Sequence, residues 1–359
     1  MYYILGIFVI ILFVLANLHY SKRRLNLHNR SLTREKVFLM VAALAVFLVF
    51  ALQSEDSNSD LVHYYYAFRR YSNYTLSDFK LIKDSIKDPF YYVLGSMFAQ
   101  LGISFHGWHL FIGFIYTLAI YLLVGRYSSN VYISFIVLIT VGSFGFAMSG
   151  LRQTMAFAFL MFSFQYLENK KIIKFSLLVL MASLFHSTAI IFLLAYPLYR
   201  LKLRLRNLII LTIGAVIVIL NGRLFLASFI NFMGTDELYS SYLDRERSLS
   251  IAGIIIFGFI LAFCLISYHL GFEDARYKGL CNLALVSLTF RILSATMVAE
   301  MFRVSMYFAV FDIILIAEAC SCGPRNVNFQ RLKTVGATLA MTSYYLVSPS
   351  GAFVNYIFR

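Results

Sequence analysis

Charged residues are scarce in this chain of 359 residues. They make up 13% of the sequence, whereas an ordinary soluble domain has about 25%. Hydrophobic residues reach 60%, and the mean hydropathy is +0.77. A water-soluble fold of this size could not bury so much apolar surface. The composition therefore excludes a soluble enzyme and a disordered chain. It predicts an all-α, polytopic integral membrane protein with one domain over residues 1–359.

Sequence motifs for nucleotide and metal chemistry are also missing. The chain has no Walker loop, no Rossmann glycine pattern, no Gly-x-Ser-x-Gly and no His-Glu-x-x-His. Its 4 cysteines lack the second Cys or His pair that a zinc site needs. We therefore expect no cofactor and no metal. A substrate that is already activated in the membrane, such as a lipid-linked pyrophosphate, fits these absences.

The formal net charge of +14 would suggest a nucleic-acid partner in a soluble protein. Here the basic residues collect in short segments that the positive-inside rule assigns to the cytoplasm, so no nucleic acid is expected. Acidic residues outnumber basic ones in two longer stretches, which are predicted to be external loops. The basic segments are 19–36, 168–174, 200–206 and 325–333, and the external loops are 53–88 and 223–248.

Hydropathy predicts about 10–12 transmembrane or re-entrant helices. The first apolar run precedes the basic residues at 22–24, which is the reverse of a cleavable signal peptide, so it is expected to remain as a helix. The apolar segments are 1–18, 37–52, 89–104, 107–124, 131–148, 153–167, 175–199, 208–222, 249–268, 280–296, 304–320 and 335–349.

The two basic segments 168–174 and 200–206 create a conflict, because only one apolar stretch separates them. Either the positive-inside rule fails at one of them, or 175–199 enters and leaves the membrane on the same side as a bent hairpin. Such a bend would fall at His186, and irregular backbone at that depth must line a protein-enclosed cavity. If 175–199 does not cross the membrane, a second apolar segment must also fail to cross, so that the other loops keep their predicted sides. The best candidate for this second segment is 89–104.

Two arginines beside apolar runs are the strongest candidates for binding an anion. Arg152 has no acidic neighbour in the sequence, and the topology places it outside, where the positive-inside rule does not explain it. Arg303 is also predicted to lie outside. Two such arginines can share one phosphate or pyrophosphate through their planar guanidinium groups. The alternatives are interfacial snorkelling of Arg152 and a local salt bridge between Glu300 and Arg303.

His186 and a cluster in the first external loop are further candidates. His186 could act as a base or a hydrogen-bond donor, or it could be structural. Asp60, His63 and Tyr64 share one face if 59–71 is helical, and Arg69 belongs to the same cluster. Such side chains suit contacts with sugars, although tyrosines also form the aromatic belt at membrane interfaces. Asp60 is the alternative to His186 as the group that activates an acceptor.

Several stretches resemble one known family. They are Gly150-Leu151-Arg152-Gln153-Thr154-Met155-Ala156, Tyr166-Leu167-Glu168-Asn169-Lys170-Lys171 and Ala182-Ser183-Leu184-Phe185-His186-Ser187-Thr188-Ala189, with Asp60, Tyr64, Asp88-Pro89-Phe90-Tyr91 and Arg303-Val304-Ser305-Met306-Tyr307-Phe308. Through these stretches the chain is similar to the EpsG family of Wzy-like polymerases over most of residues 50–310, and beyond 310 only the hydropathy agrees.

The resemblance implies a metal-independent glycosyltransferase that makes exopolysaccharide, capsule or O-antigen. Such polymerases join oligosaccharide repeat units carried on undecaprenyl pyrophosphate, at the outer (periplasmic) face of the bacterial cytoplasmic, or inner, membrane. The growing chain leaves its lipid pyrophosphate and is transferred to a sugar hydroxyl of the next lipid-linked repeat. The partners implied are therefore this donor, this acceptor and membrane lipid, with a chain-length regulator and a flippase as candidate partner proteins.

Roles for individual residues follow from this reaction. Arg152 and Arg303 would hold the pyrophosphate and stabilise its developing charge, and His186 or Asp60 would position or deprotonate the acceptor hydroxyl. The scarcity of acidic groups near the expected site leaves the general base open. Contacts with substrate are predicted for His63, Tyr64, Arg69, Gln153, Glu300 and Tyr307.

Two other functions stay open at this point. The first is a transporter or flippase of lipid-linked sugars, although no second copy of the Arg-Gln and His-Ser pattern indicates the repeats typical of transporters. The second is a membrane acyltransferase that modifies polysaccharide, which would leave Arg152 and Arg303 without a role. A purely structural membrane subunit is a further alternative.

Overall fold

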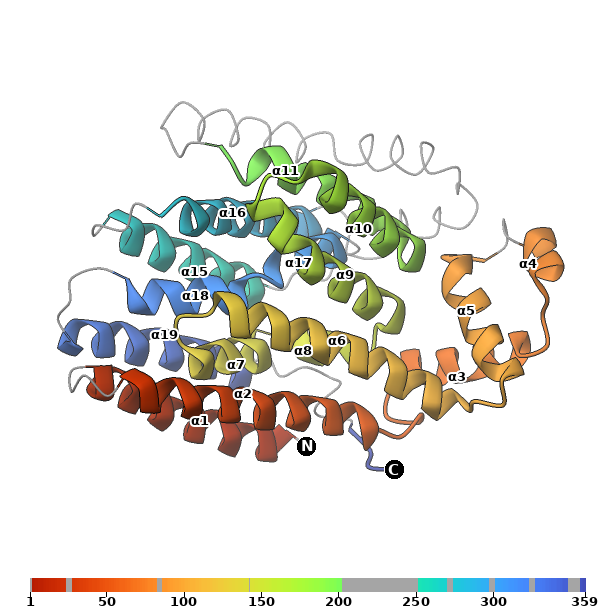
Figure 1. Cartoon of the computed structure of the whole chain (residues 1–359), viewed down its shortest axis with the longest axis horizontal. Helices are drawn as coiled ribbons and strands as arrows, with labels where there is room; N and C mark the ends of the chain where they lie inside the picture. The colour runs from red at the N-terminus through yellow and green to blue at the C-terminus, as the bar shows by residue number, and fades with distance from the viewer. Residues whose placement is uncertain are drawn as a thin grey trace.

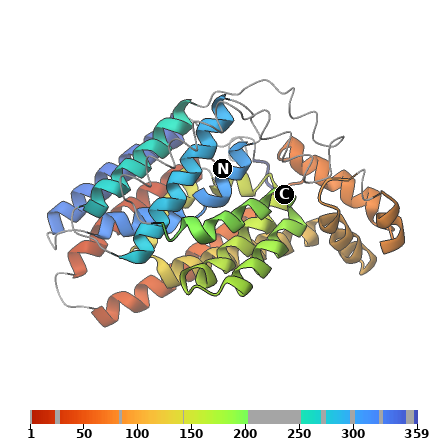
Figure 2. The ribbon, with the colours of Figure 1, turned by 90° about the horizontal axis from the view of Figure 1, so that it is seen from above.

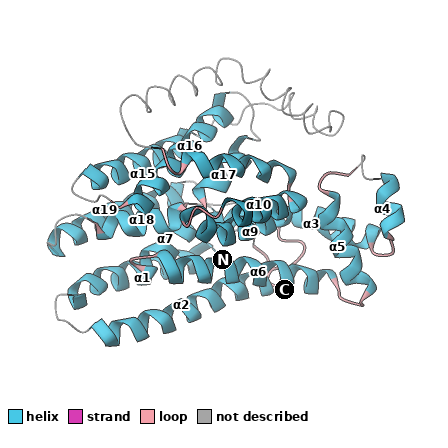
Figure 3. Cartoon of the chain, turned by 45° about the horizontal axis from the view of Figure 1, so that its top comes forward, coloured by secondary structure: helices cyan, strands magenta, loops and turns pink. Residues whose placement is uncertain are grey.

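All the regular elements of the described chain are helices, as the sequence predicts (Figure 3). The structure is a computed structural model. It describes residues 2–23, 28–82, 86–141, 143–201, 251–269, 274–296, 301–322, 327–347 and 356–359. The predicted helix 208–222 and the predicted external loop 223–248 lie outside these residues. An isolated β-bridge between Gln53 and Phe358 joins the C-terminal residues to the end of the second helix.

The helices differ in length from the apolar segments because several of them continue into polar sequence. They are α1 (Tyr2–Arg23), α2 (His28–Ala51), α3 (Ser59–Tyr71), α4 (Leu76–Ile82), α5 (Pro89–Gln100), α6 (Phe105–Tyr127), α7 (Val131–Thr140), α8 (Ser143–Ala147), α9 (Leu151–Glu168), α10 (Ile172–Phe185), the 3₁₀ helix η2 (Ser187–Leu194), α11 (Ala195–Leu198), α15 (Ile251–His269), α16 (Ala275–Thr296), α17 (Met301–Ala309), α18 (Asp312–Ser321) and α19 (Val327–Val347).

Most of the long helices run roughly along the long axis of the molecule, and α3, α4 and α5 stand together at one end (Figures 1 and 2). The first helix α1 packs against the last helix α19 and against α7, so the two ends of the chain close the bundle. The main apolar core lies between these helices and α6, α9, α16, α17 and α18. A second, smaller core surrounds Trp108 beneath α3 and α5.

Several predicted spans are interrupted. In the described part of the chain, α6 is the one helix that is long and apolar enough by itself to cross a membrane. The predicted segment 304–320 consists of α17 and α18, which meet at a bend of 46° and could together form a second span. The predicted segment 131–148 is divided into α7 and α8.

The chain folds back within 175–199, as the hairpin hypothesis predicts, and its re-entry into a membrane stays a prediction. Helix α10 ends at His186, whose extended backbone (φ −150°, ψ 108°) turns the chain into η2, and η2 packs back against α10. The returning chain reaches the level at which α10 begins, because the Tyr196 hydroxyl donates to the Lys170 carbonyl over 3.0 Å. His186 therefore lies at the apex of the hairpin.

The predicted external loop 53–88 contains helices rather than only loop. The hypothesis that 59–71 is helical is confirmed by α3, which begins after Asn58, whose side chain accepts from the Leu61 N–H over 2.9 Å. The apolar segment 89–104 contains α5, which has 12 residues. A helix of that length spans about 18 Å and is too short to cross a hydrocarbon core of about 30 Å.

Candidate active site

A cavity of about 830 Å³ lies where α3, the approach to α5, the start of α9, the apex of the hairpin and the start of α17 meet. Its described lining contains four basic residues and one acidic residue, so it favours an anion. The polar lining comprises Asp60, His63, Tyr64, Tyr66, Arg70, Tyr71, Lys87, Tyr92, Arg152, Gln153, His186 and Arg303. The fold thus brings Arg152, His186 and Arg303 together, as the sequence predicts for two arginines that share one anion.

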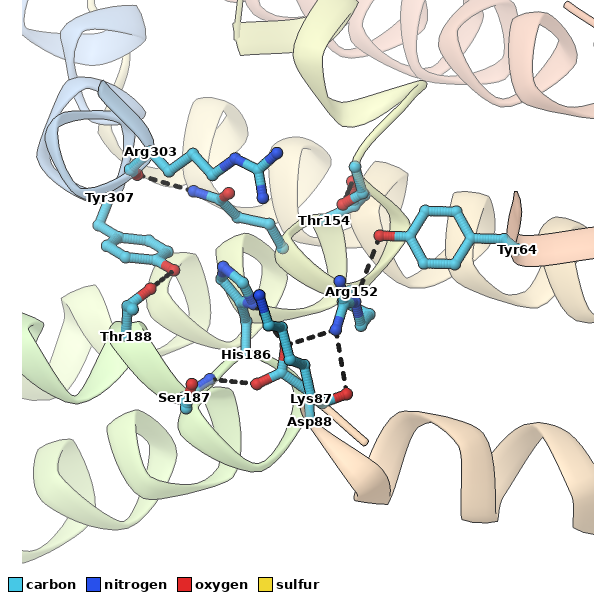
Figure 4. A network of polar contacts seen from close by, with 12 residues as sticks. Tyr64, Lys87, Asp88, Arg152, Thr154, His186, Ser187, Thr188, Arg303 and Tyr307 are labelled. Atoms are coloured by element: carbon cyan, nitrogen blue, oxygen red, sulfur yellow. Dashed lines mark hydrogen bonds and ion pairs between the residues drawn. The ribbon is translucent and has the colours of Figure 1, made fainter. Parts of the chain in front are cut away.

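Asp88 joins two of these groups directly beside the cavity (Figure 4). Its Oδ2 lies 2.7 Å from Nδ1 of His186 and 3.0 Å from Nη1 of Arg152. Its Oδ1 accepts the backbone N–H of Ser187 over 2.8 Å. Both carboxylate oxygens are therefore engaged, and the Asp88 side chain is fully buried.

The position of Asp88 before Pro89 resembles that of a helix N-cap, but its side chain makes no capping hydrogen bond to α5. Its backbone instead adopts the left-handed conformation (φ 55°, ψ 59°). This region is unfavourable for most residues with a side chain, although aspartate tolerates it better than most. The left-handed backbone coincides with a carboxylate held by three groups, which is typical of functional sites.

The surroundings of Asp88 stabilise its ionised form. Burial alone would raise the pKa of its carboxyl group, but His186, Arg152 and the Ser187 N–H together outweigh this and hold the pKa well below its usual range. Because an ionised carboxylate only accepts hydrogen bonds, Nδ1 of His186 must be the donor. In a neutral imidazole this leaves the lone pair on Nε2, which is available as a base.

Arg152 is anchored on one side and reaches the cavity on the other. Besides Asp88, its Nη1 donates to the Lys87 carbonyl over 3.0 Å, and its Nε donates to the Tyr64 hydroxyl over 3.4 Å. The rings of Tyr64 and Tyr92 flank the guanidinium at 5.8 and 5.9 Å. The side chain is 16% exposed. Arg152 has no acidic neighbour in the sequence, but in the fold Asp88 lies beside it, supplied by the segment just before α5.

The second arginine is linked to the first through α9. The Gln153 side chain, next to Arg152, donates from Nε2 to the Arg303 carbonyl over 2.7 Å, which ties the start of α9 to α17. The Arg303 side chain lines the cavity. Arg152 and Arg303 thus approach the same space from two helices.

Tyr307 contacts the apex of the hairpin from α17. Its hydroxyl lies 2.8 Å from the Thr188 hydroxyl, and its ring centroid lies 6.5 Å from that of His186. Figure 4 shows the imidazole between the pair formed by Asp88 and Arg152 and the side that carries Tyr307 and Arg303. Tyr307 is fully buried and is not among the lining residues. It contacts the hairpin apex, and the substrate contact predicted for it stays a prediction.

Helix α3 supplies the opposite wall. Asp60, His63 and Tyr64 line the cavity together, as the one-face hypothesis predicts. Arg69 does not line it, because its Nη1 lies 3.4 Å from the Tyr65 hydroxyl on another face of α3. Its neighbour Arg70 does line the cavity. The role predicted for Arg69 stays untested, and Glu300 lies outside the described residues.

Asp88 is a site residue that the sequence does not predict, although the Asp88-Pro89 pair is part of the family resemblance. Its partners His186 and Ser187 lie 98 and 99 residues further along the chain, so no local pattern connects them. The signal that could have found it is an acidic residue immediately before a short, irregular apolar segment. No group of three or more His, Cys, Asp or Glu side chains in the described chain is placed to hold a metal ion.

Comparison with known proteins agrees with the resemblance. The model of the EpsG family matches residues 36–358. No curated protein and no solved structure matches this chain. Because the family match covers nearly the whole sequence, including every residue of the cavity, the chain belongs to the EpsG family, a family of Wzy-like polysaccharide polymerases.

Proposed function

We propose that this protein joins lipid-linked oligosaccharide repeat units into a surface polysaccharide at the outer face of the bacterial cytoplasmic membrane. The donor and acceptor would both be carried on undecaprenyl pyrophosphate. The observation that carries the proposal is the cavity in which Arg152 and Arg303 lie beside a histidine held by Asp88. It combines an anion site with a base, which are the two requirements of this transfer.

The surface of the helices supports a membrane location. On α1, Ile4, Ile7 and Ile11 are 58, 61 and 49% exposed, and their spacing places them on one helical face. Met40 and Leu44 on α2 are 60 and 56% exposed. Apolar stripes of this extent are unfavourable in water. Lipid contact would explain them, which supports a polytopic arrangement.

The leaving group would bind between the two arginines. Arg152 is held by Asp88, Lys87 and Tyr64, so its guanidinium is already oriented before substrate arrives. The cavity is also lined by Arg152 and Gln153 in the first turn of α9, where the positive end of the helix favours an anion. Fixed positive groups aimed at the departing pyrophosphate stabilise the charge that develops on it in the transition state.

His186 is the base that the geometry favours over Asp60. Because Nδ1 donates to Asp88, Nε2 can accept the proton of an acceptor hydroxyl. The oxygen of that hydroxyl then bonds to the anomeric carbon of the donor. The bond from that carbon to the pyrophosphate oxygen breaks, and its electron pair leaves with the lipid pyrophosphate. Asp88 orients the imidazole and stabilises its protonated form. Asp60, exposed on α3, is then available for hydroxyl groups of the glycan.

A deletion strain provides the direct test. Without the protein, single repeat units on the lipid carrier should accumulate and polymer should disappear. A lectin that cannot cross the membrane should bind these repeats from outside. Complementation with the wild type should restore polymer, and so should Lys80→Ala, which removes an exposed positive charge from α4 away from the cavity. Repeats that accumulate only on the inner face would contradict the polymerase and support a flippase.

A further inference from the structure

A second cavity, of about 470 Å³, lies at the opposite end of α9 from the candidate active site. It is bounded by the first half of α2, the last turns of α6 and the last turns of α9. Gln165 lies 13 residues after Arg152 on the same helix, which places the two cavities about 20 Å apart along the helix axis. The two cavities therefore cannot hold the same headgroup.

The mouth of this second cavity is positively charged. Lys36 from α2 and Arg126 from α6 line it, and no acidic residue is among its described lining residues. Arg126 donates from Nη1 to Oε1 of Gln165 on α9 over 3.1 Å, which fixes one edge of the guanidinium and leaves its other N–H groups for a ligand. Lys36 and Arg126 are both exposed. This arrangement is complementary to a phosphate group.

The rest of the lining is apolar and continues along the helices. Leu39, Leu122, Met161 and Phe162 form the wall next to the two cations. Leu122 is 49% exposed, so the apolar surface extends out of the cavity toward the surroundings of the bundle. A free phosphate would gain nothing from this surface, whereas an acyl chain would gain by burying it.

We propose that this cavity binds an anionic phospholipid, with its phosphate between Lys36 and Arg126 and an acyl chain along Leu39, Leu122 and Phe162. The cavity lies at the end of the bundle where the basic segment 168–174 follows α9. Basic pockets between helices on the cytoplasmic side are suited to anionic headgroups, because that leaflet is rich in anionic lipids. The lipid would bridge α2, α6 and α9, and α9 carries Arg152 of the candidate active site at its other end.

The test is a titration of the delipidated full-length protein in detergent, followed by native mass spectrometry. Phosphatidylglycerol should bind more tightly than phosphatidylcholine with the same acyl chains. The double variant Lys36→Gln/Arg126→Gln should weaken phosphatidylglycerol binding by about tenfold or more, since each basic residue near the headgroup contributes separately. Binding of phosphatidylcholine should not change.

A charge-matched control separates this site from general attraction. Lys171→Gln/Lys174→Gln removes two charges from the same end of the molecule but not from the cavity lining, so it should keep phosphatidylglycerol binding. Lys36→Arg/Arg126→Lys keeps both charges and should also bind, which tests whether loss in the first variant reflects misfolding. Equal binding of phosphatidylglycerol and phosphatidylcholine would overturn the proposal. So would an equal loss of phosphatidylglycerol binding in Lys171→Gln/Lys174→Gln, or full competition by glycerol phosphate without acyl chains.

Discussion

Two largely enclosed arginines, Arg152 and Arg291, lie in very different environments. Arg152 shares Asp88 with His186 and lines a cavity. Arg291 on α16 is 4% exposed and does not line that cavity. Its guanidinium lies 3.4 Å from the ring centroid of Phe257 and 4.9 Å from that of Phe302, and its Nη2 lies 3.2 Å from the Met306 sulfur.

The difference shows what makes a buried cation in an apolar protein a candidate for chemistry. Burial alone does not, because Arg291 is more enclosed than Arg152 and is stabilised by aromatic faces. Arg152 has in addition access for a ligand and a carboxylate 3.0 Å away that also holds His186. The comparison therefore predicts that changing Arg152 removes activity, whereas changing Arg291 removes stability.

The largest effect is expected for Arg152→Ala. Polymer per folded protein should fall by about 100-fold or more, the usual cost of removing one transition-state electrostatic group. Arg152→Lys should also be impaired, because an ammonium cannot reproduce the directed contacts of a guanidinium with Asp88, Lys87 and Tyr64. Polymer length and amount on gels, normalised to the amount of protein in the membrane, measure this. An unchanged polysaccharide length in Arg152→Ala would contradict a role for Arg152 in the reaction.

Asp88→Asn should lower the chain-extension rate by about 10- to 100-fold while the protein still folds, because an amide fails to hold the His186 tautomer and to neutralise Arg152. The measurement is the rate of extension with purified protein across a pH series. A lowered rate with an altered pH profile is expected for a positioning residue. A lowered rate that merely follows protein loss would indicate a structural role only.

The low pKa of Asp88 also predicts a pH-dependent contribution to stability. Because its pKa in the fold is lower than in the unfolded chain, this contribution is complete above about pH 4 and is lost as the pH falls below it. The wild type should therefore have a higher Tm than Asp88→Asn at pH 7, and the gap should narrow as the pH falls below about 4. A gap that stays constant over this range would contradict the ionised carboxylate.

Arg291→Met should show the opposite pattern to Arg152→Ala. Loss of the stacked cation should destabilise the protein by about 1–2 kcal/mol, seen as a lower Tm in detergent. Polymer per folded protein should stay within about twofold of the wild type, since the side chain does not line the cavity. A severe loss of polymer at normal protein level would break the distinction between the two arginines.

The smallest effect separates two neighbours on α3. Arg70→Ala should reduce chain extension by a few-fold, about the cost of one exposed charge contact, because Arg70 lines the cavity. Arg69→Ala should have less effect, because Arg69 contacts Tyr65 on another face of the helix. The ratio of extension rates for these two variants is the measurement. The reverse order would favour the residue that the sequence predicted.

Much of the fold follows from local sequence. Hydropathy predicts the all-helical class, and the two basic segments 168–174 and 200–206 predict the interruption at His186, because each signal depends on residues that are near one another in the chain. The breaks within 131–148 and 304–320 were not predicted. Uniformly apolar segments give no local signal for a bend, and packing against neighbouring helices decides where it falls.

Part of the candidate site also follows from the sequence, and the rest follows only from the fold. The sequence by itself indicated Arg152, His186 and Arg303, because a charge or an imidazole beside an apolar run needs an explanation. Only the tertiary structure brought Asp88 to His186 across 98 residues and turned Arg70 rather than Arg69 to the cavity. Hydropathy reports the cost of placing a group in an apolar environment. Which partner offsets that cost depends on contacts between distant segments, and these exist only once the chain has folded.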